Sequence, residues 1–550
     1  NGFLDFKGLE AGTYTLQEVK SPDGFRLDDT KRVVTITKEG EITISGLAQN
    51  KYGNFDVTNQ KIPEGQITVI KKWKDKKKPE ERIMPTIKIS GKKPEVKYEG
   101  EATIGKDQWS SAKDALNMKT GKTFQKDEGI YTAKSFVRKH SNAKKVDDGI
   151  TAKSIYLYRD GDDFYWWTDA EKVYLAQDSS NMFYGCSNLI SLDLNSFGAE
   201  NVIDMGGMFY DCLNLVSLDI NSWKTYSLEN VIGIVGMGYH IGMFQSCQSL
   251  TSLDLSNFDT SGVSDMSHMF YDCSGLTQLD LSNFDTSGVS DMSYMFYNCF
   301  RLTQLHLSSF NTNKVTAMHS MFEKCKSLTS LDLNNFNTSS VTDMSFMFSY
   351  CYDLTQLDLS NFNTSNVIGM RSMFEWCSEL IQLDISNFDT SKVTNMQSMF
   401  EGCKKLTPLD LSSFNTSKVT DMGSMFGGCW ALTSLDLNNF NVEKVTDMGG
   451  MFGHCYDLTI LKIDSWKTSS LDKIHSSEHG TGIFEDCGSL TALNLNGFDT
   501  SKIINMGSMF EGCSSLTTLD VSNFDTSKAT NMSYMFDTCS NLIELDLSNF

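Results

Sequence analysis

The sequence predicts a long α/β solenoid of 26-residue repeats preceded by an all-β sandwich region. Three observations lead to this prediction. Cysteine recurs at a nearly constant step over most of the chain, the hydrophobic pattern changes period within each step, and charge is segregated between the two ends. Lys and Arg outnumber Asp and Glu by 29 to 22 in residues 1–150, whereas Asp and Glu lead by 47 to 19 afterwards.

A single unit repeats across residues 182–550, and each copy contains one of the 14 cysteines. Successive cysteines are 26 residues apart except for steps of 35 after Cys212 and 32 after Cys455. The unit reads L-T-x-L-D-L-S-N-F-[DN]-T-S-x-V-T-D-M-x-x-M-F-x-x-C-x-x. A unit of this length cannot bury its own apolar face, so neighbouring copies must stack.

The first half of the unit predicts a short strand. Leu331, Leu333 and Phe336 are apolar, and polar residues stand between them, which is the alternation of a half-buried strand. Stacked copies of this strand predict a parallel sheet, which we expect on the concave face of the solenoid. Its outward-facing positions would form a large flat surface.

The second half of the unit predicts a short helix. Its apolar residues fall at i, i+3, i+4 and i+7, as in Met344, Met347, Phe348 and Cys351. Thr342 and Asp343 precede this stripe and are candidate N-caps. One strand and one short helix per unit give the predicted α/β class.

The cysteines lie on this apolar stripe in every unit. Parallel stacking points the side chains of neighbouring copies in the same direction, which is unsuitable for an S–S bond. We therefore expect buried, reduced thiols that act as small apolar side chains. The same reasoning makes the methionines and cysteines core residues and not ligands of a soft metal, so no metal is expected.

The repeated unit resembles the BspA-type leucine-rich repeats of bacterial surface proteins over residues 182–550. The preceding segment, residues 151–181, resembles the N-terminal cap of such arrays, and a solenoid needs a cover on its first rung. The resemblance implies an extracellular protein of a Gram-positive bacterium, secreted or anchored to the cell wall. Any leader and wall anchor are expected outside this chain.

Residues 1–62 resemble a Cna B-type domain, a SpaA-like prealbumin fold that serves as a stalk. The residues that carry this resemblance are Gly8–Val19, Ser21–Phe25 and Val57–Asn59. Alternating residues in Arg32–Thr37 and Glu41–Ile44 independently predict strands of a β-sandwich. In that family an acid assists an isopeptide bond between Lys and Asn, which implies roles for Glu18 as the acid and Asn59 as the amide.

Residues 63–150 are predicted as a second β-sandwich domain or a linker. Gln66–Trp73 resembles the opening strand of another Cna B-type domain, in which Lys71 matches the reactive lysine. The lysine-rich residues 94–150 have a weak pattern, and both alternatives stay open for them.

Net charge and hydropathy exclude some partners. The C-terminal part carries a net charge of −28, which repels nucleic-acid phosphates and anionic lipid headgroups. No apolar stretch reaches the length of a membrane span, so direct membrane insertion is not expected. Protein partners are favoured, and the sequence leaves the oligomeric state open.

The sequence contains no convincing catalytic constellation. His475–His479 matches the H-x-x-E-H pattern of one metalloprotease group, but it is flanked by Ser and Gly and lacks a helical stripe. No nucleophile elbow or phosphate-binding glycine loop is present. We therefore expect no enzymatic activity, no cofactor and no metal.

An aspartate ladder is the candidate partner-binding site. The Asp of L-D-L repeats without interruption on five consecutive units at Asp332, Asp358, Asp384, Asp410 and Asp436. One interpretation is that these carboxylates are solvated and prevent aggregation of the sheet. The other is that they recruit a basic protein segment or divalent cations.

Two longer units are expected to flank the ladder and to contact the partner on either side of it. Each carries Trp, as Trp223 or Trp466, where the other units carry Phe, and each contains an insertion. Because both units open alike, their insertions should project from the same edge. Function concentrates where a scaffold permits variation, which makes these insertions candidates for partner binding.

These features predict a cell-surface adhesin or binding protein. The solenoid would engage protein partners of a host matrix or of other cells, while the β-sandwich region displays it. The alternative is a structural or self-associating surface-layer protein without a specific ligand. Binding to a purified partner by a monomeric array would separate the two.

Overall fold

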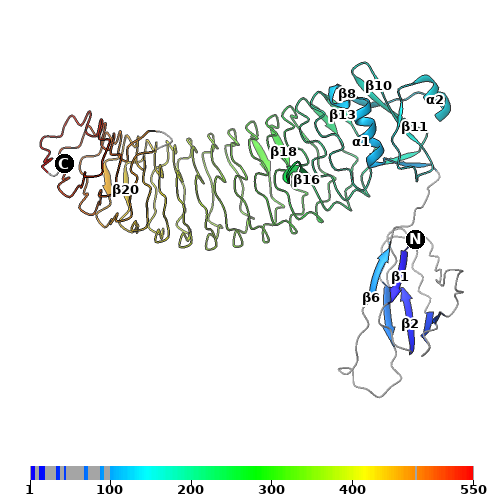
Figure 1. The fold of residues 1–550 in the computed structure, drawn as a ribbon, viewed down its shortest axis with the longest axis horizontal. Helices are drawn as coiled ribbons and strands as arrows, with labels where there is room; N and C mark the ends of the chain where they lie inside the picture. The colour runs from blue at the N-terminus through cyan, green and yellow to red at the C-terminus, as the bar shows by residue number, and fades with distance from the viewer. Residues whose placement is uncertain are drawn as a thin grey trace. The chain divides into compact units, whose positions relative to one another are not determined.

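A computed structural model describes residues 100–476, 480–548 and 550, together with the backbone of six strands between residues 2 and 91. The chain divides into two compact units, Asn1–Val96 and Lys97–Phe550. In Figure 1 the second unit is a long stack of rungs that begins with a small mixed region. Each unit is described separately.

The first unit is built from antiparallel strands. They are β1 (Gly2–Phe6), β2 (Gly12–Glu18), β3 (Arg32–Ile36), β4 (Ile42–Ile44), β5 (Ile67–Lys71) and β6 (Ile87–Gly91). Strands β4, β3, β2 and β5 form one sheet, and β1 pairs with β6. The predicted strands in Arg32–Thr37 and Glu41–Ile44 are confirmed.

The predicted domain boundary at residue 62 is wrong. Strand β5 pairs with β2, and β6 pairs with β1, so both later strands complete the sheets of the first unit. The strands after residue 62 therefore belong to the first compact unit, which extends to Val96.

The array begins with a mixed α/β cap. Its elements are β7 (Glu101–Thr103), α1 (Lys106–Ala115), the short 3-10 helix η2 (Met118–Thr120), β8 (Thr123–Lys126), α2 (Ala133–Lys139), β9 (Lys144–Lys145), β10 (Ile155–Asp160), β11 (Asp163–Thr168) and β12 (Lys172–Tyr174). No helix in the described part of the chain is long and apolar enough to span a bilayer. Because its first element is β7, the cap starts near residue 101 and not at residue 151.

The cap covers the first rung by extending its sheet. Strand β8 runs parallel to β13 (Ser191–Asp193), the first strand of the repeats, and β11 pairs with β8 on the other side. Helix α1 buries Trp109, whose indole N–H donates to the Met182 carbonyl at 2.9 Å. Residues 101–150 are consequently neither a linker nor a second sandwich, and one continuous hydrophobic core runs from the cap into the repeats.

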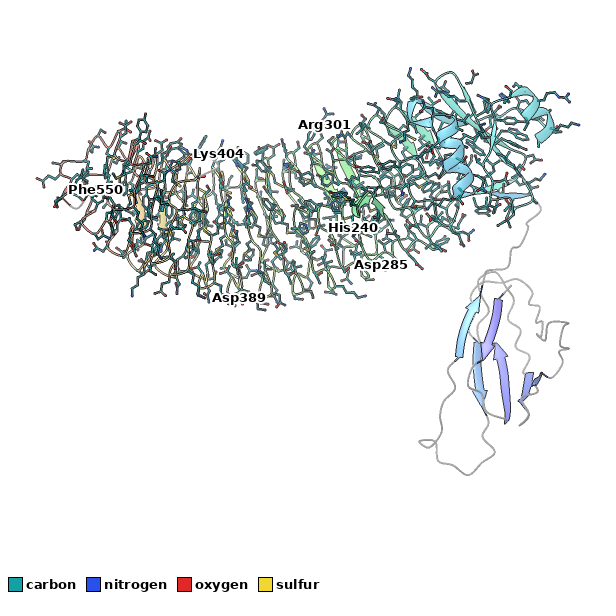
Figure 2. All side chains as sticks on the ribbon, viewed as in Figure 1. His240, Asp285, Arg301, Asp389, Lys404 and Phe550 are labelled. Atoms are coloured by element: carbon teal, nitrogen blue, oxygen red, sulfur yellow. The ribbon has the colours of Figure 1, made fainter. Side chains whose placement is uncertain are left out.

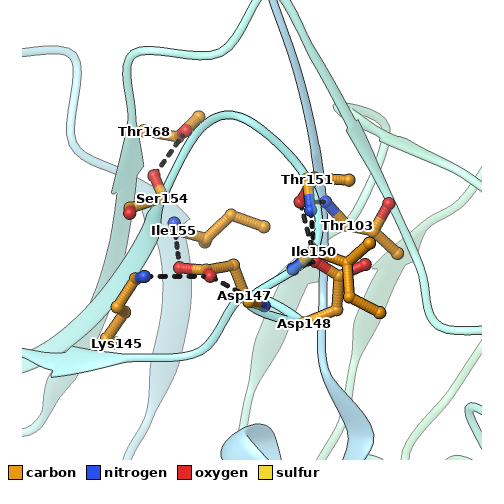
Figure 3. A network of polar contacts seen from close by, with 10 residues as sticks. Thr103, Lys145, Asp147, Asp148, Ile150, Thr151, Ser154, Ile155 and Thr168 are labelled. Atoms are coloured by element: carbon orange, nitrogen blue, oxygen red, sulfur yellow. Dashed lines mark hydrogen bonds and ion pairs between the residues drawn. The ribbon is translucent and has the colours of Figure 1, made fainter. Parts of the chain in front are cut away.

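A polar network fixes the loop between β9 and β10 (Figure 3). The buried Asp147 carboxylate accepts a hydrogen bond from the Ile155 backbone N–H at 3.2 Å and forms an ion pair with Lys145. Thr151 donates to Asp148 and accepts from the Thr103 backbone N–H at 3.1 Å. The loop is thereby attached to both β7 and β10.

The repeats form rungs with two parallel ladders. The L-D-L segments make the first ladder, whose strands are β13, β15 (Ser217–Asp219), β18 (Gln278–Asp280), β19 (Gln304–His306), β20 (Ser434–Asp436) and β21 (Ile460–Lys462). The D-M segments make the second through single bridges such as Asp265 with Asp291. We call these sides the strand flank and the turn flank.

The predicted short helix is wrong, because the M-x-x-M-F-x-x-C segment forms successive turns. Phe346 and Tyr350 have φ values of 59° and 58°, which a right-handed helix cannot contain. Met347 donates to the Met344 carbonyl within one turn, while Phe348 donates to Met373 on the next rung. Backbone N–H groups thus alternate between their own turn and the neighbouring rung.

The strand flank is not the concave surface. Figure 2 places Arg301 and Lys404 on the upper edge of the array, which is concave in Figure 1, and Asp285 and Asp389 on the lower, convex edge. The chain crosses the lower edge between the strand and turn flanks and the upper edge on its return. The two flanks therefore lie on opposite sides of the core and run between the edges.

Ring spacing gives the physical reason for this curvature. The rings of Phe400 and Phe426 in the M-F segments are 5.8 Å apart, whereas Phe414 and Phe440, at the convex edge of the same step, are 6.4 Å apart. The rungs spread at the edge that holds the N-F phenylalanines, so the solenoid bends away from that edge.

Buried threonines and more exposed asparagines connect the rungs at the convex edge. The Thr390 hydroxyl donates to the Asn415 carbonyl at 3.0 Å and accepts from the Asn415 N–H at 2.8 Å. The Asn387 amide donates to the carbonyls of Leu359 and Phe362 on the preceding rung. These contacts recur along the array and satisfy backbone groups that water cannot reach.

Candidate functional site

The aspartate ladder lies exposed on consecutive rungs of the strand flank. Its members are the five predicted residues Asp332, Asp358, Asp384, Asp410 and Asp436. The aliphatic residues on either side of each aspartate are buried, as Leu383 and Ile385 illustrate. The alternation in the sequence therefore predicted correctly which side chains face solvent.

Each ladder aspartate also has a local structural role. Its Oδ1 accepts a hydrogen bond from the backbone N–H two residues later, at 3.0 Å for Asp384 with Ser386 and 2.9 Å for Asp410 with Ser412. This backbone hydrogen bond holds the pKa of Asp384 and Asp410 below the ordinary value. The carboxylates of Asp384 and Asp410 are therefore ionised at neutral pH.

Little positive charge compensates the ladder. Lys462 forms an ion pair with Asp436 at 3.0 Å, and the lysine hydrogen bond is the main cause of the lowered pKa of Asp436. Among the described residues, the other four ladder aspartates have no ion-pair partner. The strand flank therefore presents uncompensated carboxylates from Asp332 to Asp410.

Trp223 and Trp466 do not reach solvent. Both side chains are almost completely buried, and their indole N–H groups donate to the carbonyls of Leu194 and Leu437 at 3.1 Å. Each tryptophan occupies the N-F position of its rung, where the convex-edge spacing accommodates a larger ring. Their predicted role as exposed partner contacts is wrong, because their apolar surface is part of the core.

Both insertions occur at the same place in their rungs, as predicted. The first is a hairpin of β16 (Ile232–Val235) and β17 (Tyr239–Gly242). In the second, His475 pairs antiparallel with Gly482. Both interrupt the D-M ladder, so they project from the turn flank. They do not flank the aspartate ladder, which lies across the core from them.

Comparison with known protein families finds a match over the repeats. Overlapping stretches at residues 168–240, 236–330, 303–406, 377–481 and 478–550 match a family described as "Mycoplasma protein of unknown function, DUF285". Together these matches cover more than half of the chain. The chain belongs to the DUF285 family.

A second family matches the N-terminal residues that precede the DUF285 repeats in the sequence. Residues 1–50 match the SpaA family, described as a prealbumin-like fold domain. No curated protein matches the chain.

Two solved structures are loosely similar. A leucine-rich repeat protein from Eubacterium ventriosum is 16% identical, with 69% of this chain and 85% of that one covered, at a TM-score of 0.26. A TLR13–ssRNA13 complex is 14% identical, with 65% of this chain and 62% of that one covered, at a TM-score of 0.16.

The DUF285 cysteines are free thiols inside the core. Thirteen are buried, and Cys539 is partly exposed. From Cys212 onward, each thiol donates to a phenylalanine carbonyl of the preceding rung, as Cys325 does to Phe296 at 3.1 Å. Burial raises the pKa of Cys299 to about 12, which suppresses the reactive thiolate.

We expect thiol titration to reflect this burial. In native protein, 5,5′-dithiobis(2-nitrobenzoate) should react with about one thiol. That thiol should be the partly exposed Cys539, and all 14 cysteines should react in denaturant. A Cys539→Ser variant is the control and should remove the native signal. A mass deficit that shows disulfides in untreated protein would contradict the expectation.

The H-x-x-E-H segment forms part of the second insertion. Glu478 and His479 lie outside the described residues. His475 pairs through its backbone with Gly482 in the hairpin described above. The segment begins in a hairpin, so it does not begin on the helix that this zinc motif requires.

One other group of potential metal ligands occurs among the described residues. Atoms of His454, Glu485 and Asp486 lie within 4.8 Å of one another. His454 Nδ1 contacts Asp486 at 3.1 Å, and Glu485 accepts from the Gly482 N–H at 2.8 Å. One imidazole and two carboxylates can coordinate a divalent cation, but these internal contacts already account for their proximity.

The isopeptide candidates are separated in the first unit. Glu18 on β2 lies opposite Ile67, while Lys71 on β5 lies opposite Tyr14. The register thus separates the two backbone positions by four residues, roughly 13 Å along a strand. Asn59 lies outside the described residues. The structure does not bring Glu18 and Lys71 together.

Sequence reasoning missed a group of aromatic residues on the turn flank. Tyr210, Tyr271 and Tyr297 follow the M-F pair on three rungs, and the exposed Tyr239 belongs to the first insertion. The recurrence of tyrosine at one position, 26 residues apart for Tyr271 and Tyr297, was the available signal. These residues surround a groove beside the first hairpin.

Proposed function

We propose that this chain is a cell-surface adhesin whose repeat array binds protein partners of a host matrix or of neighbouring cells. The observation that carries the proposal is the uncompensated aspartate ladder of the strand flank. Carboxylates on successive rungs offer complementary charge to a basic protein surface and accelerate its encounter.

Two further observations support display outside the cell. The repeated unit resembles BspA-type surface proteins, and residues 1–50 match a prealbumin-like domain of the kind used in stalks. The proposal accordingly places the chain on the cell wall of a Gram-positive bacterium or among its secreted proteins. It describes a binding protein that requires no catalysis, cofactor or metal.

Rigidity of the array supports this role. Backbone groups of each rung are hydrogen-bonded within turns or to neighbouring rungs, as with Phe348 and Thr390. A surface that is already ordered loses little conformational entropy when a partner binds. The strand flank can therefore act as a fixed template.

Replacing all five ladder aspartates with asparagine tests the proposal. The chain would be assayed against immobilised fibronectin, laminin and collagen, with its mass in solution measured by light scattering. We expect affinity at low salt to fall roughly tenfold and its salt dependence to flatten. Folding should be retained, because asparagine can accept the same backbone hydrogen bond.

A matched control removes five carboxylates from the F-D-T positions of the convex edge. Its substitutions are Asp259→Asn, Asp285→Asn, Asp389→Asn, Asp499→Asn and Asp525→Asn. Each of these residues also accepts a backbone hydrogen bond from the residue two positions later. Equal loss in both variants would show a general charge effect. Binding by oligomers alone would favour the self-associating surface protein.

A further inference from the structure

A groove of about 700 Å³ lies on the turn flank beside the first hairpin. The hairpin supplies one side, and successive rungs supply the other. The lining includes Tyr239, His268, Tyr271, Tyr294, Tyr297 and Glu323. In Figure 2 His240 lies between the two edges of the array, away from both. Because the hairpin interrupts the D-M ladder of the turn flank, the groove is separate from the aspartate ladder of the strand flank.

Stacked rings form the rung side of the groove. Tyr271 and Tyr297 stack at 4.5 Å with an interplanar angle of 11°, and His268 stacks on Tyr294 at 4.9 Å. Tyr294 also meets Tyr297 edge to face at 5.8 Å. Neighbouring rungs hold these rings in place, so a ligand meets a preformed aromatic surface. Such a surface offers contact area at low entropic cost.

The hairpin adds exposed apolar surface. Tyr239 is 68% exposed, Ile234 is 66% exposed, and Met237 near the turn is 94% exposed. Large apolar side chains that gather on one projection are typical of a contact surface and not of solvent-facing structure. The hairpin and the stacked rings together offer two walls that a ligand could contact.

Carboxylates dominate the charge around the groove. Glu323 lines it at 9% exposure, and Asp265, Asp272, Asp291 and Asp343 lie close enough to act on its histidine and tyrosines. Such a charge favours a cationic ligand.

The positive groups near the groove offset only part of this charge. Burial lowers the pKa of His268, so its imidazole is neutral at physiological pH, and its buried Nδ1 has no hydrogen-bond partner. His240 lies 4.0 Å from Asp265, and Lys324 is paired with Glu323 at 3.3 Å.

A cation already contacts this aromatic wall at its edge. The Lys324 ammonium donates to the Tyr297 hydroxyl and lies 4.5 Å from the centroid of that ring. Cations are attracted to the faces of such rings, and a guanidinium stacks on them better than an ammonium because it is planar and less strongly hydrated. The Glu323 carboxylate can also receive paired N–H donors from a guanidinium.

We propose that this groove binds an arginine side chain of a basic, extended peptide segment in the protein partner. The guanidinium would stack between Tyr239 and the rung tyrosines and form an ion pair with Glu323. This inference deepens the proposed adhesin function and rests on it for the partner class, but it assigns recognition to a different surface from the ladder. The hairpin makes the groove specific to this part of the array.

Binding of a fluorescent hexa-arginine peptide to the full chain tests the proposal by anisotropy. Tyr239→Ala and Glu323→Gln are each expected to weaken binding about tenfold. Hexalysine should bind several-fold more weakly than hexa-arginine and should be less affected by Tyr239→Ala. Trp430→Ala, which alters an exposed aromatic side chain on another part of the array, is the matched control and should change nothing.

The outcomes separate this proposal from the adhesin proposal. Unchanged hexa-arginine binding in both groove variants would overturn the groove assignment, even if matrix binding still depends on the ladder. Binding of neutral cellohexaose that is lost in the same variants would overturn it in favour of a carbohydrate site. Groove-dependent arginine binding without any binding to matrix proteins would support the groove and count against the adhesin. Far-ultraviolet circular dichroism verifies that each variant is folded.

Discussion

Thr390→Val is expected to destabilise the array by about 2–5 kcal/mol, because two buried backbone groups lose their partners. Thr390 is completely buried, and its hydroxyl both donates to and accepts from the backbone of Asn415 on the next rung. Valine has nearly the same shape, so packing is preserved while the N–H and C=O of Asn415 are left unsatisfied. Urea denaturation followed by circular dichroism measures the change in the free energy of unfolding.

Two substitutions control this measurement. Thr390→Ser keeps the hydroxyl and loses one methyl group, and should cost about 1 kcal/mol. Thr420→Val makes the same chemical change at an exposed position and should stay within about 0.5 kcal/mol of the parent. If Thr390→Val and Thr420→Val unfold at the same urea concentration, the buried hydroxyl contributes no stability and the prediction is wrong.

Phe374→Ala is expected to cost about 3–5 kcal/mol through the cavity that it leaves. The Phe374 ring is completely buried and stacks between Phe348 and Phe400, each 5.8 Å away. Each rung is stabilised by its neighbours, so the loss should weaken both adjoining interfaces. Hydrogen exchange measured by mass spectrometry should show reduced protection on the rungs on either side.

An exposed aromatic side chain provides the comparison for Phe374. Trp430 is 42% exposed and contacts Lys404, whose ammonium lies 4.1 Å from its ring. Trp430→Ala should lower stability less than Phe374→Ala, because its ring already contacts water and its removal leaves no closed cavity. Equal effects of the two substitutions on unfolding would contradict the stacked core as the main source of stability.

The sequence predicted the repeat and its inward-facing residues. Alternation in L-D-L identified Leu383 as buried and Asp384 as exposed, since a strand turns successive side chains to opposite sides. The position of the cysteines on the apolar stripe likewise placed thirteen of them in the core. Periodicity alone was sufficient because every rung experiences the same environment.

The same periodicity could not decide between a helix and turns. Met344, Met347, Phe348 and Cys351 point inward in either conformation. The turns depend on left-handed residues such as Phe346, whose N–H donates to a carbonyl of the following rung. That hydrogen bond forms only when the rungs stack, so the local sequence pattern cannot predict it.

Some features of the candidate sites were predictable from the sequence, and others required the tertiary structure. The sequence by itself determined the aspartate ladder, because its members follow the repeat and face outward on every rung. Only the tertiary structure decided that Trp223 is core, that the insertions lie across the core from the ladder, and that Tyr239 and Glu323 line one groove. Tyr239 and Glu323 are 84 residues apart in the sequence. They line the same groove because the rungs stack and the hairpin projects beside them.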